Sequence, residues 1–157
     1  MKRQRKSLAQ LITRVRNDAR GVAAVEFSIV APLMILMTLC TIDLGLGTFR
    51  MLQVENAAHA GSQYAILRGF NGSAITTAIT SATSFSDITA SPAPYTFSGC
   101  ASVSGVTTVS ANALCADGST PGTYVTASSA GTYNTLFAYP GIPKSFQFKA
   151  QSTVRIQ

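Results

Sequence analysis

The sequence predicts an α+β protein with a long N-terminal helix, a short second helix and a small antiparallel sheet. Three observations support this fold class. A membrane-length apolar run follows a basic N-terminus, small apolar residues continue at helical spacing to residue 69, and the end of the chain alternates apolar and polar residues. A 3.6-residue period predicts an amphipathic helix, and a period of two predicts a strand. We expect the long helix to have a transmembrane half and an extracytoplasmic half.

The charge of the chain is concentrated at its N-terminus. The 157 residues include 12 Lys and Arg against 6 Asp and Glu. Residues 1–21 hold seven of the basic residues and one acid, so they account for the whole net charge of +6. A nucleic-acid-binding protein usually keeps its positive charge on a folded face, whereas here the charge abuts an apolar segment, as in a cytoplasmic membrane flank. We therefore expect a basic cytoplasmic leader and no nucleic-acid partner.

Residues 22–69 are predicted to form one helix that lies half in lipid. The run 27–49 contains a single charged residue, Asp43, and exceeds the roughly 20 residues that span a bilayer. Pro32 lies inside this run, and membrane helices tolerate proline. The basic flank favours a cytoplasmic N-terminus, which would place everything after Phe49 outside the cytoplasm. A buried helix of a soluble protein is the alternative interpretation.

Beyond the apolar run, the helix is expected to continue to a stop at Gly69. One face carries small apolar side chains, so that a partner can approach closely, and the other face is polar. The apolar face comprises Val54, Ala58, Gly61 and Ala65, and the polar face comprises Asn56, His59 and Gln63.

Residues 70–157 are expected to form an extracytoplasmic α+β domain. A helix capped by Ser73 is predicted to run to about Ser84, with one apolar face made of Ile75, Ala78, Ile79 and Ala82. Proline and glycine punctuate 85–122, which is expected to be rich in loops. A short strand is allowed there by Val103, Val106 and Val109.

Two longer strands are predicted at 124–136 and 145–156. The second has a strict period of two, which predicts one buried and one solvent-exposed face. Its apolar positions are Phe146, Phe148, Ala150, Ser152, Val154 and Ile156, and the residues between them are polar or charged.

The three cysteines favour an oxidising compartment for the end of the chain. Cys100 and Cys115 lie beyond the membrane segment, which suggests a disulfide. Cys40 lies inside the apolar run, where we expect a small lipid-facing or packing residue and not a reactive thiol.

The sequence offers little for metal binding or catalysis. His59 is the only histidine, and no further cysteine lies near the pair, so a four-ligand zinc site within one chain is not expected. No Ser–His–Asp or Cys–His set stands out. We predict neither a cofactor nor an enzyme.

The most informative residue is a carboxylate at the inner end of the apolar run. Burying an acid in mid-bilayer costs about 3 kcal/mol, so Glu26 needs a reason. Gly21 fits a protease site that has no room for a β-carbon, and cleavage there would make Val22 the new N-terminus. An ammonium on a neighbouring subunit could then pair with Glu26. The alternatives are an interfacial carboxylate outside the lipid and a conventional secretory signal.

The string from Arg20 to Phe27, RGVAAVEF, resembles the prepilin peptidase site of type IV pilin-like proteins: a basic leader, a glycine, then glutamate as the fifth mature residue. More specifically, it is similar to the TadE-like minor pilins of the tight-adherence (Flp) pilus. Residues 54–61 resemble the small-residue helix of that family, and residues 115–118 and 150–155 resemble it more loosely. Typical type IV pilins begin with Phe, whereas this chain would begin with Val22.

The resemblance implies a pilin-like fold and a role in pilus assembly, adhesion and biofilm formation. A prepilin peptidase would cleave between Gly21 and Val22, and Glu26 and Phe27 would serve peptidase recognition and assembly. The implied partners are the prepilin peptidase, other minor pilins, the major Flp pilin, the inner-membrane assembly platform and membrane lipid. The implied location is the bacterial inner membrane, with the domain after the span in the periplasm or incorporated into the pilus.

Two other functional classes stay open at the level of the sequence. One is a membrane-tethered periplasmic binding module that keeps its leader. The other is an exported enzyme.

Overall fold

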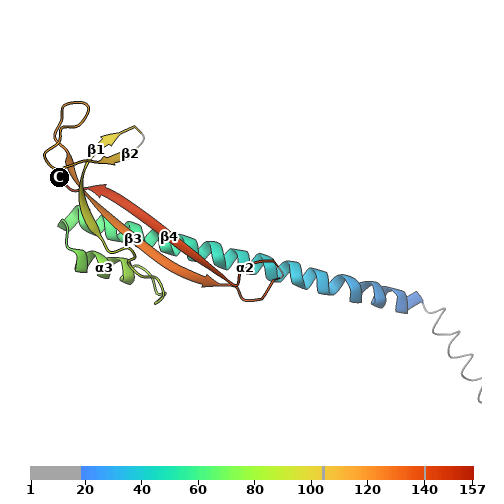
Figure 1. Cartoon of the computed structure of the whole chain (residues 1–157). Coiled ribbons are helices and arrows are strands. Elements are labelled where there is room, and N and C mark those ends of the chain that lie inside the picture. Colours follow the sequence, from blue (N-terminus) through green and yellow to red (C-terminus); the bar gives the residue numbers. More distant parts are fainter. Residues whose placement is uncertain (1–18, 104, 140) are drawn as a thin grey trace, which may run out of the picture. The chain divides into compact units, whose positions relative to one another are not determined.

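In the computed structural model of the chain, residues 19–103, 105–139 and 141–157 are described (Figure 1). The predicted α+β class is confirmed, because a long helix is followed by a short helix and an antiparallel sheet. The elements are the helices α2 (Ala19–Arg68) and α3 (Gly72–Ser81) and the strands β1 (Tyr95–Ser102), β2 (Gly105–Thr108), β3 (Gly122–Asn134) and β4 (Ser145–Arg155). Most of the predicted leader, residues 1–18, lies outside the described residues.

Internal packing divides the chain into two units, Met1–Leu44 and Gly45–Gln157. The second unit contains the outer half of α2 together with α3 and the sheet. The predicted division into 1–21, 22–69 and 70–157 concerns processing and membrane topology, and it stays a prediction.

Helix α2 is continuous over 50 residues and contains Pro32. It ends where predicted, because Gly69 has a φ of +76°. Its N–H donates a 2.9 Å hydrogen bond to the carbonyl oxygen of Ala65. This is the left-handed cap that glycine supplies at helix C-termini without a steric penalty.

The small-residue face of α2 forms one wall of the core of the second unit. The side chains that pack with it come from α3, β3 and the segment before β1, and the core cluster comprises Val54, Ala57, Ala65, Ile75, Ile79, Ile88, Val125 and Ala127. A Cβ atom built on Gly61 would lie 2.6 Å from Cγ1 of Ile79 and 3.0 Å from Cβ of Ala127. The close partner expected for this face is therefore the chain's own α3 and β3 (Figure 1). The polar face is exposed, as predicted.

Helix α3 begins earlier than predicted. Its N-cap is Asn71, whose Oδ1 accepts the N–H of Ala74 at 3.1 Å. The proposed cap, Ser73, instead lies inside the helix and donates from its hydroxyl to Asn71 Oδ1 at 2.9 Å. Asn and Ser are similarly good caps, so residue type alone did not decide between them. Ile75 and Ile79 are buried as expected.

The sheet is antiparallel with the strand order β2-β1-β3-β4. Strands β3 and β4 form its longest ladder, from Tyr124 opposite Arg155 to Asn134 opposite Ser145. Both predicted long strands are confirmed, with β3 beginning and ending two residues earlier than predicted. The period of two in β4 is also confirmed, since the predicted inner positions from Phe148 to Ile156 are half-buried and the residues between them are exposed.

Strand β1 lies in a region for which loops were predicted. Pro94 and Gly99 flank or interrupt its sequence, and both residues are depleted in strands. The allowed short strand exists as β2, but it contains Val106 alone of the three valines. Val103 lies in the turn that leads into β2 and is fully exposed.

Side-chain hydrogen bonds join α2 to the sheet. The hydroxyl of Ser129 on β3 donates to the carbonyl oxygen of Val54 at 2.6 Å, and both residues are buried. The hydroxyl of Ser152 on β4 donates to the hydroxyl of Ser62 at 2.8 Å. Hydroxyls inside a core need such partners, so these bonds fix the sheet on the small-residue face of the helix.

Candidate functional site

The predicted cleavage pair, Gly21 and Val22, lies near the start of α2. Apart from its chain neighbours and the backbone of its own helical turns, no described atom lies within 4 Å of a Cβ built on Gly21, and its φ is not positive. Among the described residues, neither packing nor backbone conformation requires glycine here. Glycine in a helix costs up to about 1 kcal/mol relative to alanine.

Glu26 follows Val22 by one helical turn and is exposed. Residues four apart share a helix face, so the carboxylate lies on the same side of α2 as the predicted new N-terminus. Its apolar neighbours are also open to solvent: Val22 is 57% exposed and Phe27 72%. Val22 and Glu26 thus form an exposed strip along one face of α2, and Phe27 is exposed next to it.

The helix surface after Glu26 is apolar on every side. Large side chains around its circumference are about half exposed or more, including Phe27, Ile29, Val30, Leu33, Met34, Ile35, Leu36, Met37, Ile42 and Leu44. A helix that is apolar all round belongs inside a large protein or a membrane. Within the described part of the chain, one helix is long and apolar enough to cross a membrane, and its apolar window is not buried.

Hydroxyls in the apolar segment bond to the helix's own backbone. Ser28 donates to the carbonyl oxygen of Val25 at 2.7 Å, and Thr38 donates to that of Met34 at 2.8 Å. Thr41 makes the same kind of bond to Met37, at 2.9 Å. An unsatisfied polar group in hydrocarbon costs several kcal/mol, so these bonds make the hydroxyls compatible with lipid.

Asp43 and Cys40, also polar residues of the run, are at least partly covered. Asp43, which the sequence places near the outer end of the span, is only 4% exposed. Its side chain is therefore shielded by protein. Cys40 is half-buried and carries a free thiol, as the packing role predicted for it requires.

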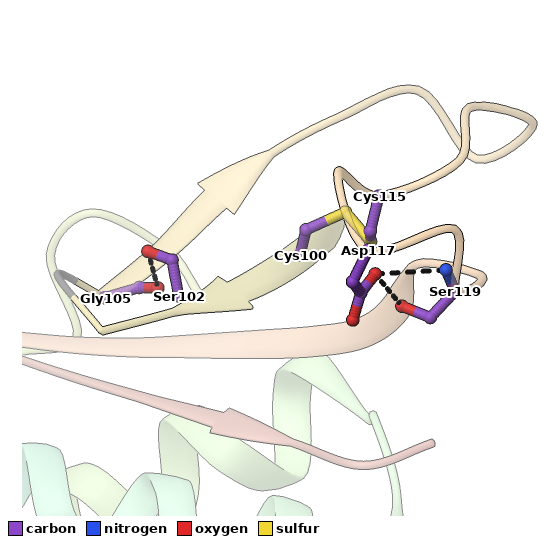
Figure 2. Close-up of a disulfide and its surroundings, with 6 residues drawn as sticks. All are labelled: Cys100, Ser102, Gly105, Cys115, Asp117 and Ser119. Carbon is purple, nitrogen blue, oxygen red and sulfur yellow. Dashed lines mark hydrogen bonds between the residues drawn. A yellow bond between two sulfur atoms is a disulfide. The ribbon is translucent and has the colours of Figure 1, made fainter.

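The suggested disulfide is present and joins β1 to the loop that precedes β3 (Figure 2). The Cα atoms of Cys100 and Cys115 lie 5.6 Å apart, within the range that disulfides bridge. The loop that carries Cys115 is compact: the Gly118 N–H donates to the Cys115 carbonyl oxygen at 2.8 Å, and the Cys115 N–H donates to that of Ser119 at 2.9 Å. Gly118 has a φ of +81°, which this turn requires.

Asp117 organises the tip of this loop. Its Oδ1 accepts the hydroxyl of Ser119 at 2.7 Å and the N–H of Ser119 at 3.0 Å (Figure 2). Hydrogen bonds to the ionised form lower the pKa of the Asp117 carboxyl below its usual value, with the hydroxyl of Ser119 as the largest cause. Sequence reasoning noted the Cys–Ala–Asp–Gly string as a resemblance without a role. Asp and Gly are typical turn residues, which is the signal that could have indicated this turn.

Histidine and acid side chains do not gather into a metal site within the residues that the structure describes. His59 is exposed on the polar face of α2. The predictions that the chain is not an enzyme and holds no cofactor stay predictions.

In a comparison with protein families, the model described as TadE-like protein matches residues 21–63. The match covers 43 of the 157 residues. Neither a curated protein nor a solved structure matches the chain. The similarity to TadE-like proteins is thus confirmed for the segment that contains Gly21, Glu26 and most of the small-residue face. The looser resemblance at residues 115–118 and 150–155 lies outside the matched residues.

Proposed function

We propose, from its TadE-like segment, that this chain is a membrane-anchored minor pilin or pseudopilin of a tight-adherence pilus, processed between Gly21 and Val22 by a prepilin peptidase. The TadE-like match supports a pilus-related membrane protein. The observation that carries the finer proposal is that the matched segment begins at Gly21, directly after the basic residues and five residues before Glu26. A protease pocket that excludes a β-carbon accounts for that glycine.

Cleavage would remove residues 1–21 and leave a free ammonium group on Val22. Glu26 lies one turn further along the same exposed strip. If the carboxylate of one subunit pairs with the ammonium of its neighbour, the two helices are offset by about one turn, about 6 Å. A buried ion pair is weak evidence for stability, but one of its best-attested uses is to set register. Glu26 would then specify how subunits align in the membrane or the fibre.

The rest of the molecule suits the same role. The apolar part of α2 would hold the subunit in the inner membrane until the assembly platform engages it. The unit from Gly45 to Gln157 would lie outside the cytoplasm, where the disulfide between Cys100 and Cys115 can form and persist. That unit would contact other minor pilins or the major Flp pilin and so contribute to adhesion and biofilm formation.

A pair of glycine variants tests the processing step. Gly21 and Gly45 both lie in α2, and a Cβ at either position meets no described atom within 4 Å beyond its chain neighbours and the local helix backbone. Gly21→Leu should accumulate at the unprocessed size in immunoblots of the membrane fraction, whereas Gly45→Leu should be processed normally. Normal processing of Gly21→Leu would count against the proposal.

A pair of glutamate variants tests the assembly step. Glu26→Gln removes the carboxylate at the membrane end of α2, and Glu55→Gln removes one from the outer half of the same helix. We expect Glu26→Gln to lose incorporation into the pilus assembly and Glu55→Gln to retain it. Equal incorporation of both variants would argue for a tether, and a hydrolytic activity lost in His59→Ala would argue for an exported enzyme.

A further inference from the structure

We propose that the connection between β3 and β4 rests in the outer membrane–water interface, beside the point where α2 leaves the bilayer. This inference takes from the proposed function only that α2 spans a membrane. The connection exposes three large apolar side chains, hereafter the apolar tip: Leu136 is 57% exposed, Phe137 45% and Ile142 49%. Exposed apolar clusters mark interaction surfaces, and the position of this one points to lipid.

The apolar tip has a defined base. The N–H of Thr135 donates to the carbonyl oxygen of Lys144 at 2.9 Å, directly after the last pair of the β3–β4 ladder, Asn134 and Ser145. Within the connection, the rings of Phe137 and Tyr139 pack edge to face with centroids 6.4 Å apart. The tip therefore projects from the end of the β3–β4 hairpin (Figure 1).

The end of this hairpin lies beside Gly47 of α2. A Cβ built on Gly47 would lie 3.6 Å from the ring of Tyr133, the penultimate residue of β3. If the span starts at Phe27, a core of about 30 Å is crossed in about 20 residues, which brings the outer boundary close to Gly47. Leu136 follows Tyr133 by three residues, at most about 10 Å of chain. The apolar tip is therefore within reach of that boundary.

The chemistry of the connection suits an interface. Aromatic side chains concentrate at the level of lipid headgroups, and lysine accompanies them because its charged end reaches water or anionic headgroups. Tyr139 and Lys144 supply these types beside the apolar tip. Leu46 and Phe49 lie on either side of Gly47 and are 42% and 49% exposed. They extend the apolar surface of the span along α2 to the level of the apolar tip. A bilayer can cover both surfaces at once.

A second exposed apolar group provides the matched control. Ile66, Leu67 and Phe70 are exposed at the far end of α2 and just beyond it. The helix rises about 1.5 Å per residue, so Arg68 lies about 30 Å beyond Gly47 and that group is out of reach of the bilayer. Phe70 is 44% exposed, almost the same as Phe137 at 45%.

Tryptophan fluorescence can test the inference, because the chain contains no Trp. The full chain is reconstituted at a high lipid ratio into phosphatidylcholine–phosphatidylglycerol vesicles, with and without brominated lipid. Phe137→Trp should emit at shorter wavelength than Phe70→Trp and be quenched by lipids brominated near the headgroup. Phe70→Trp should emit as in water and be quenched by aqueous iodide. Ile142→Trp repeats the test if Phe137→Trp fails to fold.

A third reporter separates this inference from the proposed function. Leu36→Trp lies within the span and should be quenched by deeply brominated lipid. If Leu36→Trp is quenched but Phe137→Trp and Ile142→Trp behave like Phe70→Trp, then α2 spans the membrane and the inference about the apolar tip is overturned. A blue-shifted Phe137→Trp without quenching by lipid would mean that protein covers the tip, which also overturns it. Absence of quenching at Leu36→Trp would instead overturn the membrane span itself.

Discussion

Arg50 and Asp87 form an ion pair that ties α2 to the segment leading towards the sheet. Arg50 Nη2 lies 3.0 Å from Asp87 Oδ1, and the guanidinium carbon lies 3.7 Å from the ring centroid of Phe85. The other carboxylate oxygen of Asp87 accepts the N–H of Thr132 on β3 at 3.2 Å. One pair of side chains thus connects helix, loop and strand near the point where the apolar run ends.

We expect this pair to contribute measurable stability. The Arg50 side chain is 16% exposed and that of Asp87 40%, so the ion pair is partly screened and contributes at most about 1 kcal/mol, with a similar amount from the cation–π contact. A double-mutant cycle measures this contribution. The free energy of unfolding by denaturant is determined for Arg50→Met, for Asp87→Asn and for the double variant, and the departure from additivity is the coupling free energy between the two side chains. Additive effects would show that the two side chains act independently.

Gly61→Ala should destabilise the second unit. The added methyl group would lie 2.6 Å from Cγ1 of Ile79 and 3.0 Å from Cβ of Ala127, and overpacking of this kind costs about 1–3 kcal/mol. This exceeds the gain of about 1 kcal/mol that alanine offers in a helix. Gly72→Ala is the control, because its nearest contact would be 3.7 Å from Phe70. Thermal unfolding in detergent measures both, and an unchanged Tm for Gly61→Ala would contradict the packing described.

The disulfide should stabilise the sheet end of the molecule. Cys100 and Cys115 are 15 residues apart, and closing such a loop restricts the unfolded chain by about 3 kcal/mol. Replacing both cysteines by serine, or adding reductant, should lower the free energy of unfolding by about 3 kcal/mol and therefore lower the denaturant midpoint. Cys40→Ser should leave that midpoint unchanged, since Cys40 is not in a disulfide. A midpoint insensitive to reductant would show that the bond is not formed in the native protein.

The loop around Asp117 should loosen in acid. Hydrogen bonds from Ser119 lower the pKa of the Asp117 carboxyl below 3.8 in the folded state. Because the pKa is lower in the folded loop than in the unfolded chain, the ionised carboxylate stabilises the loop at a pH above the pKa of the unfolded chain. That stability is lost as the pH falls through the pKa of the folded state. Amide chemical shifts of Gly118 and Ser119, followed by NMR from pH 6 downwards, should change together below pH 3.8. The control is Ser119→Ala, which should raise the apparent pKa of Asp117. No change in that pKa would show that the bonds do not form in solution.

The elements that could be predicted best from the sequence are those with a long periodic pattern of apolar residues. The apolar run, the small-residue face around Gly61 and the alternation of β4 all follow from the period of the residues that face a common environment. Gly69 could be predicted as a stop because its cap is set by backbone conformation alone. The predicted start of α3 was wrong because Asn71 and Ser73 are both good N-caps. Only the geometry of the folded chain shows that Asn71 is the cap.

Long-range pairing explains what the sequence did not predict. Strand β1 is short, lies beside Pro94 and contains Gly99, so its local signals favour a loop. It forms because β3 and β2 pair with it on both sides. The candidate site residues Gly21 and Glu26 were proposed from a local string: a basic leader, a glycine and, five residues later, an acid at the start of an apolar run. Their roles in processing and assembly stay predictions.

The central claim is that the subunit matures by losing residues 1–21. Its most direct measurement is the intact mass and N-terminal sequence of the protein purified from native membranes or pili. A mature chain that begins at Val22 is the predicted result. A chain that retains Met1 or any part of the leader would contradict the account.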